Sequence, residues 1–111
     1  MPRRKKRDLE WAEPAATHLE EIRKYIAKDS PLNATRFIAR IKREVDRLRS
    51  FPHSGELLAR GEGGDLREIY VKSYRIVFRF HEAAVRNLAI IHGARDFDLF
   101  EQNLGMEQDD S

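Results

Sequence analysis

Basic side chains that could bind phosphate or carboxylate groups lie along the segments predicted to be strands in the second half of the chain. Guanidinium groups bind both kinds of anion in a bidentate manner. Arg75 and Arg79 are four residues apart, so both project from one face of one strand. The alternative is that these cations only solvate an open sheet face and cover it with their aliphatic stems. The full set is Arg67, Lys72, Arg75, Arg79, Arg86, His92 and Arg95.

Other catalytic and metal-binding patterns are not found in the sequence. The chain has no cysteine, which excludes disulfides, Cys-based zinc sites and thiol nucleophiles. Its four histidines lack metal-ligand spacing, and we expect His18 and His53 to be plain surface residues. Residues 61–64 are glycine-rich, but a strand rather than a helix follows them, so a flexible loop is expected there. No metal and no cofactor are expected.

Length and composition indicate one globular domain. The chain has 111 residues, of which 41% are hydrophobic and 36% charged, with a net charge of +2. Residues 1–7 are expected to be a basic disordered tail, residues 8–105 a single domain and residues 106–111 an acidic tail. No apolar run approaches the roughly 20 residues that cross a bilayer. A cytoplasmic protein without membrane contact is therefore expected.

The elements that carry the basic residues begin with a helix hairpin. Residues 8–12 alternate polar and apolar and predict a short strand, and a helix is expected over 14–28. Ser30 and Pro31 predict the start of a second helix over 31–50. The two-residue connection requires the helices to be antiparallel. The outer face of the second helix is basic, with Arg36, Arg40, Lys42, Arg43, Arg47 and Arg49.

Three further strands are expected over 66–72, 74–80 and 85–92, after a loop over 55–65. Short gaps predict an antiparallel meander. A terminal helix is expected from Asp96. The order β-α-α-β-β-β-(α) predicts an α+β fold, an antiparallel sheet packed on one face against the N-terminal helix hairpin. The predicted core contains Leu19, Ile22, Ile26, Phe37, Ile41, Val45, Leu48, Ile76 and Phe78.

Short fragments in this order resemble the RelE/ParE toxin superfamily of bacterial type II toxin–antitoxin systems. The resemblance runs from Leu9 to about Phe100. It is carried by the order and spacing of the fragments together with the independently predicted element order. The main fragments are Trp11-Ala12, Ser30-Pro31-Leu32-Asn33-Ala34, Phe51-Pro52, Leu66-Arg67-Glu68, Tyr74-Arg75-Ile76, Phe78-Arg79 and Ile91-His92-Gly93-Ala94-Arg95-Asp96.

The resemblance implies one of two activities. RelE-like members cut mRNA on the ribosome, and here the catalytic groups would be Arg67, Lys72, Arg75, Arg79, His92 and Arg95. ParE-like members inhibit DNA gyrase, in which case no catalytic residue is expected and target binding falls to Arg75, Arg79, His92 and Arg95. No tyrosine follows Tyr74, and the fragment His92–Asp96 looks ParE-like. We therefore favour the gyrase inhibitor.

The resemblance also implies a cognate antitoxin as partner. Apolar anchors near Trp11, Leu19 and Phe37 are expected to bind it, with Arg40 and Arg43 attracting an acidic segment. A third interpretation stays open at this point, in which the chain is a basic nucleic-acid-binding domain unrelated to toxicity.

Overall fold

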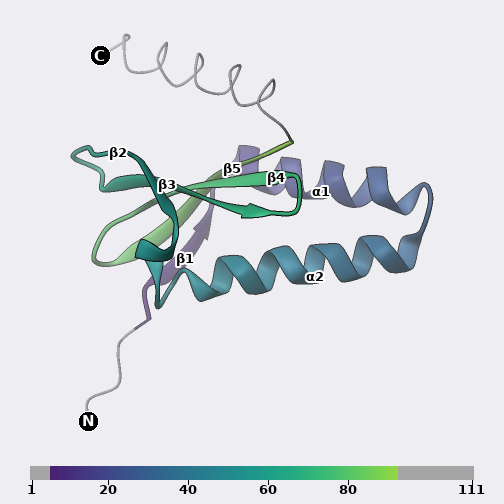
Figure 1. The fold of residues 1–111 in the computed structure, drawn as a ribbon, viewed down its shortest axis with the longest axis horizontal. Helices are drawn as coiled ribbons and strands as arrows, with labels where there is room; N and C mark the ends of the chain where they lie inside the picture. The colour runs from purple at the N-terminus through teal and green to yellow at the C-terminus, as the bar shows by residue number, and fades with distance from the viewer. Residues whose placement is uncertain (1–5, 93–111) are drawn as a thin grey trace, which may run out of the picture.

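The structure, a computed structural model, describes residues 6–92 and consists of two helices and a five-stranded sheet (Figure 1). The predicted α+β class is confirmed, and the predicted elements between residues 8 and 92 occur in the expected order, with one additional strand. In chain order the elements are β1 (Asp8–Trp11), α1 (Glu13–Ala27), α2 (Pro31–Arg47), a short 3-10 turn (Pro52–Ser54), β2 (Glu56–Ala59), β3 (Asp65–Val71), β4 (Tyr74–Phe80) and β5 (Ala84–His92).

The helix hairpin forms where the sequence predicts it. The Ser30 hydroxyl accepts a hydrogen bond from the Asn33 backbone N–H at 3.2 Å, and Pro31 occupies the first turn, where a missing N–H costs nothing. The two helices lie side by side and antiparallel on the same side of the sheet (Figure 1). Their ends at Ala27 and Arg47 fall one and three residues before the predicted ends.

The sheet is mixed, which corrects the prediction of a purely antiparallel one. The strand order is β1-β5-β4-β3-β2, and β3, β4 and β5 are antiparallel neighbours as expected. Strand β2 is also antiparallel, to β3. Strand β1 instead runs parallel to β5, with Leu9 opposite Val85. Short turns determine the relative direction only of strands that follow one another in the chain. Strand β1 pairs with β5, which is far from it in the sequence, so no turn length predicts their direction.

The predicted loop over 55–65 is partly wrong, because residues 56–59 form the edge strand β2. Four residues are too few to show alternation, and the nearby glycines favoured a loop. These glycines belong to the connection between β2 and β3. Gly64 has a φ of 109°, and a Cβ there would lie 2.1 Å from the Phe80 carbonyl oxygen, so this position requires glycine.

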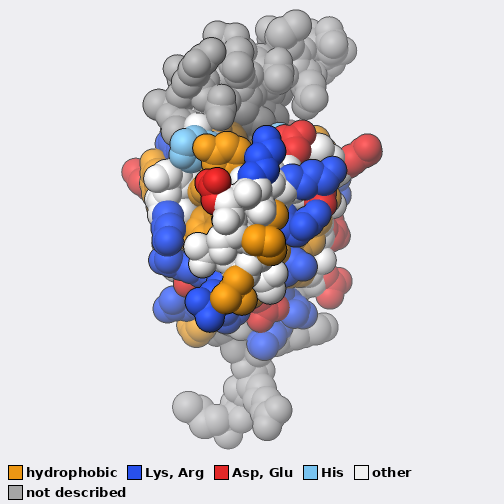
Figure 2. Space-filling model, turned by 90° about the vertical axis from the view of Figure 1, so that its right-hand side faces the viewer, with side chains coloured by type: hydrophobic (Ala, Val, Ile, Leu, Met, Phe, Trp, Pro, Cys, Tyr) orange, Lys and Arg blue, Asp and Glu red, His pale blue; other side chains and the backbone are white. Residues whose placement is uncertain are grey.

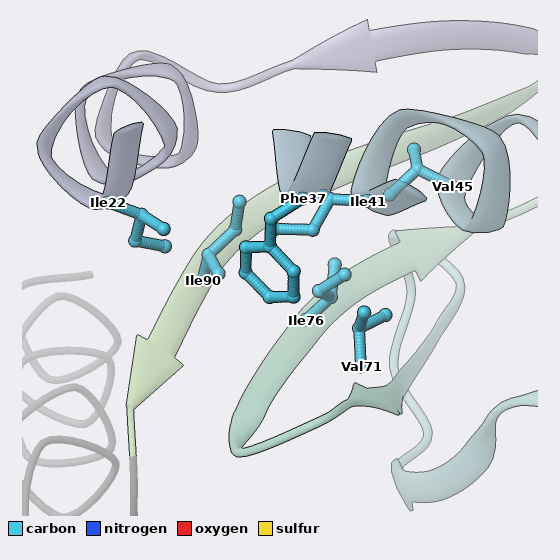
Figure 3. Packing of buried hydrophobic residues seen from close by; sticks show 7 residues of the cluster. All are labelled: Ile22, Phe37, Ile41, Val45, Val71, Ile76 and Ile90. Atoms are coloured by element: carbon cyan, nitrogen blue, oxygen red, sulfur yellow. The ribbon is translucent and has the colours of Figure 1, made fainter. Parts of the chain in front are cut away.

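The main core lies between the hairpin and the sheet (Figure 3). Most predicted core residues are buried there, but Leu19 and Ile26 are only partly buried at its edge. The opposite sheet face is not simply open, because Val77, Ala89 and Ile91 are buried in a separate small cluster. The main cluster comprises Ile22, Phe37, Ile41, Val45, Val71, Ile76 and Ile90, and a second one Leu48, Phe78, Phe80 and Val85.

The interpretation of His18 as a plain surface residue is wrong. His18 lies half-buried on α1, and its Nδ1 accepts a hydrogen bond from the Ile90 backbone N–H at 3.2 Å. Strand β1 pairs with β5 only as far as Asn87, so the outward N–H of Ile90 has no ladder partner. The imidazole supplies the missing acceptor and ties α1 to the sheet. His53 is exposed, as predicted, although its ring lies 5.0 Å from that of Phe80.

Several predicted features lie outside the described residues. They are the terminal helix from Asp96, Arg95, the acidic tail over 106–111 and most of the basic tail. Within residues 6–92, neither helix is long and apolar enough to span a membrane.

Candidate functional site

Arg75 is bound to an internal carboxylate. Its Nε and Nη2 donate to the two oxygens of Glu68 at 2.9 and 2.8 Å, and its guanidinium lies 5.4 Å from the ring centre of Tyr70. The Glu68 side chain is 2% exposed and that of Arg75 is 17% exposed. Hydrogen bonding to Glu68 raises the pKa of Arg75 above its usual range. The pair is therefore a fixed feature of the sheet face away from the helices.

Arg79 projects from the same face as Arg75, as predicted, but it contacts the β2–β3 connection. Its Nη1 donates to the Gly64 carbonyl at 3.1 Å, and a Cβ on Gly63 would lie 3.3 Å from its Cδ. The side chain thus packs against the glycine segment. Nothing larger than glycine fits against it there without displacement.

Arg67 lies on the opposite sheet face, which corrects its grouping with Arg75 and Arg79. It pairs with Phe78 across the ladder and alternates with Glu68 along β3. Its Nη1 donates to the Gly55 carbonyl at 2.7 Å, and its Nη2 contacts Asp65 at 3.3 Å. The guanidinium holds the turn before β2.

Lys72, Tyr74 and His92 gather at the end of the sheet beside α2. The Tyr74 ring lies 4.8 Å from that of His92 and 5.5 Å from that of Phe37, and the Lys72 ammonium lies 5.7 Å from the Phe37 ring centre. Burial, with a smaller effect of Tyr25, raises the pKa of the Tyr74 hydroxyl above its ordinary value near 10. His92 and Lys72 are exposed.

Sequence reasoning did not find this aromatic cluster, because its members are brought together by the register of β4 with β5 and by the packing of α2 on the sheet. Tyr74 opposes His92 across the ladder between β4 and β5, and α2 supplies Phe37. Nor did it find Glu68 as the partner of Arg75. The alternation of the Leu66-Arg67-Glu68 fragment, combined with a two-residue turn at Lys72-Ser73, would have predicted that contact.

The residues predicted to bind an antitoxin divide into two groups. Phe37 is 8% exposed within the main core, and Trp11 and Leu19 pack partly buried against it. Arg40 and Arg43 are exposed on α2. The large apolar side chains with the highest exposure near the hairpin end are instead Tyr25 and Leu32. Figure 2 views that end and shows small apolar patches separated by Lys and Arg side chains.

The predicted cations therefore do not converge on one site. Arg75 and Arg79 share one sheet face, Arg67 lies on the other, and Lys72 and His92 lie beside α2. Guanidinium groups that already hold a carboxylate or carbonyl are poorly placed to bind the phosphate of a substrate as well. Over residues 6–92, no three His, Asp or Glu side chains lie together as a metal site would require.

The helix hairpin on a mixed sheet, with β1 parallel to β5, defines a small α+β domain of the RelE/ParE type. Residues 9–97 match the family described as ParE toxin of type II toxin-antitoxin system, parDE. The chain belongs to this family and is a toxin of a type II toxin–antitoxin system, in which an antitoxin is the partner. The interpretation as a nucleic-acid-binding domain unrelated to toxicity is wrong.

Individual relatives agree with this assignment. The chain is 35% identical over 86 residues to "Toxin RelE2" of Caulobacter vibrioides, covering 77% of this chain and 93% of that protein. It is 45% identical over 47 residues to "Putative toxin Y4kP" of Sinorhizobium fredii, covering 42% and 49%. The fold is similar to a chain of the chromosomal ParDE toxin–antitoxin system from P. aeruginosa, with a TM-score of 0.64, 21% identity and coverage of 78% and 96%.

Proposed function

We propose that this toxin inhibits DNA gyrase in the cytoplasm and that its cognate antitoxin neutralises it by direct binding. The proposal rests on the observation that the arginines which an RNA-cleaving site would use are already bound to other groups of this chain. Arg75 is held by Glu68, Arg79 by the Gly64 carbonyl and Arg67 by Gly55 and Asp65.

RNA cleavage by 2′-hydroxyl attack needs a base, an acid and free cations close to one phosphate. The distribution of these cations over two sheet faces argues against such a site. Inhibition by binding has no such requirement, because a binding surface needs exposed groups rather than convergent ones. Membership of the ParE family supports the same conclusion.

Ribosome-dependent mRNA cleavage is the second candidate. It is favoured by the similarity to a relative named RelE2 and by the contact between Tyr74 and His92 with Lys72 nearby. A tyrosine whose pKa is raised is poorly suited as a base near neutral pH, but it retains a proton to donate. This candidate would use Lys72 and His92 rather than the arginines.

For gyrase binding we propose the exposed end of β5, where His92 lies, together with Arg95. Arg75 and Arg79 would contribute to the shape of the sheet face that gyrase contacts. They would not contribute a free charge, because Arg75 is bound to Glu68 and Arg79 to the Gly64 carbonyl. For the antitoxin we propose contacts around Trp11 and Leu19, at the half-buried edge of the core. Phe37 would support that edge from within the core. Arg40 and Arg43 would speed the encounter with an acidic segment.

Two assays on the purified full-length chain separate the candidates. A gyrase inhibitor blocks supercoiling of relaxed plasmid and leaves ribosome-bound mRNA intact. A ribonuclease gives the opposite pattern. Equimolar antitoxin should relieve either effect.

Variants identify which side chains are responsible. Cleavage of ribosome-bound mRNA that disappears in His92→Ala or Arg79→Ala would overturn the gyrase proposal. The matched control is His53→Ala, which changes an exposed histidine elsewhere on the surface. Circular dichroism spectra must agree among the variants, so that loss of fold does not pass for loss of activity.

A further inference from the structure

The outer face of α2 carries a straight row of four arginines, which we call the α2 arginine row. Arg36, Arg40, Arg43 and Arg47 follow one another at spacings of four, three and four residues, so they project from one side of the helix. All four are exposed, whereas Ile41 and Val45 on the opposite side of the helix are fully buried. The row therefore points directly away from the core.

These arginines differ from most others between residues 6 and 92 because none of them is paired with an acidic side chain, although Glu44 lies within helical reach of Arg40 and Arg47. None of the four forms a hydrogen bond or ion pair with another residue between 6 and 92. By contrast, Arg23, Arg49 and Arg86 are all paired with acidic side chains. Of the two acids on α2, Asp46 is bound to Arg49 rather than to the row.

We propose that the α2 arginine row binds the phosphate backbone of duplex DNA. At 1.5 Å per residue the row extends about 16 Å along the helix axis, and each strand of a duplex carries one phosphate per about 3.4 Å. The row therefore presents its guanidinium groups over a length that matches about five phosphates of one strand. Guanidinium groups are also the side chains best suited to phosphate.

Two features of the row favour duplex DNA over other polyanions. A tightly bound protein partner needs apolar anchors at the centre of its interface. The exposed large apolar side chain on this side of α2, Leu32, lies one turn before Arg36 and not among the arginines. Single-stranded nucleic acids bind through aromatic side chains on which bases stack, and the row carries none. The inference goes beyond the gyrase proposal and does not depend on it. It shares Arg40 and Arg43 with the proposed antitoxin encounter, which needs only long-range attraction, and the test below separates the two uses.

The test is fluorescence anisotropy of a labelled 20-bp duplex titrated with the full-length chain at several salt concentrations. Each phosphate contact contributes about −0.9 to the slope of log K against log salt. Replacing Arg40 and Arg43 together by glutamine should therefore make the slope shallower by about 1.8. In affinity, this corresponds to about a 12-fold smaller loss between roughly 50 and 200 mM salt.

The matched control is Lys24→Gln with Lys28→Gln, which removes the same charge from exposed positions in the last turn of α1 and directly after it. Its slope should stay close to that of the native chain. Equal slopes for the native chain and the Arg40/Arg43 variant would overturn the inference, as would an equal effect of the control. Slower antitoxin association with an unchanged DNA slope would assign the row to the acidic partner instead. Preferential binding of a single-stranded 20-mer would also contradict it.

Discussion

Removing Arg75 should destabilise the domain more than neutralising its partner Glu68. In Arg75→Met the thioether chain keeps the stem packing on Tyr70 but leaves the Glu68 carboxylate, 2% exposed, without its cation. Breaking a buried pair from one side costs about 3–5 kcal/mol. We expect a value near the lower end, because the Tyr70 hydroxyl still interacts with Glu68.

In Glu68→Gln the amide oxygen still accepts from Arg75, and the guanidinium, 17% exposed, can turn towards water. One of the two hydrogen bonds is lost together with the charge assistance, because the amide NH2 takes the place of an acceptor oxygen, so the cost should be about 1–3 kcal/mol. The double variant Glu68→Leu with Arg75→Met should recover much of the loss, because two apolar groups then replace the whole pair.

Urea unfolding followed by circular dichroism measures the three free energies under the same conditions. The reasoning is refuted if Arg75→Met costs no more than Glu68→Gln, or if both cost under about 0.5 kcal/mol, the scale of an ordinary surface substitution.

Three further perturbations test the packing and the aromatic cluster. Ile41→Ala, at a fully buried site, should cost about 2–5 kcal/mol in urea unfolding, whereas Leu32→Ala, 57% exposed, should stay within about 0.5 kcal/mol. Gly55→Ala should cost about 1–3 kcal/mol by overpacking, because its Cβ would lie 2.7 Å from Cζ of Phe78. The raised pKa of Tyr74 means that the folded state holds this proton longer than the unfolded state, so its contribution is full below about pH 10 and is lost above it. Alkaline unfolding curves should therefore show Tyr74→Phe losing less stability than the native chain, and parallel curves would contradict the burial of Tyr74.

Local signals predicted the helices and the main core well. Ser30 and Pro31 predicted the start of α2, and the apolar residues predicted to lie along one side of this helix pack into the main core. These features depend on neighbours in the sequence, which fix helical periodicity and capping. The parallel pairing of β1 with β5 depends on a contact between opposite ends of the chain, and no local pattern encodes its direction.

The candidate site was predicted less well for the same reason. The types of Arg67, Arg75 and Arg79 indicated anion binding, but their partners are set by strand alternation and loop packing. Glu68 lies diagonally across the ladder from Arg75, and the Gly64 carbonyl reaches Arg79 from a neighbouring connection. The residue types therefore predicted the positive charges correctly, but they did not predict that these arginines are bound to groups within the domain.

The most direct test of the proposed activity is a supercoiling assay with purified gyrase, relaxed plasmid and increasing amounts of the folded full-length toxin. The account predicts that supercoiled product disappears as toxin is added and returns when equimolar antitoxin is supplied. Undiminished supercoiling at a large excess of toxin, with the same preparation cutting ribosome-bound mRNA, would contradict it.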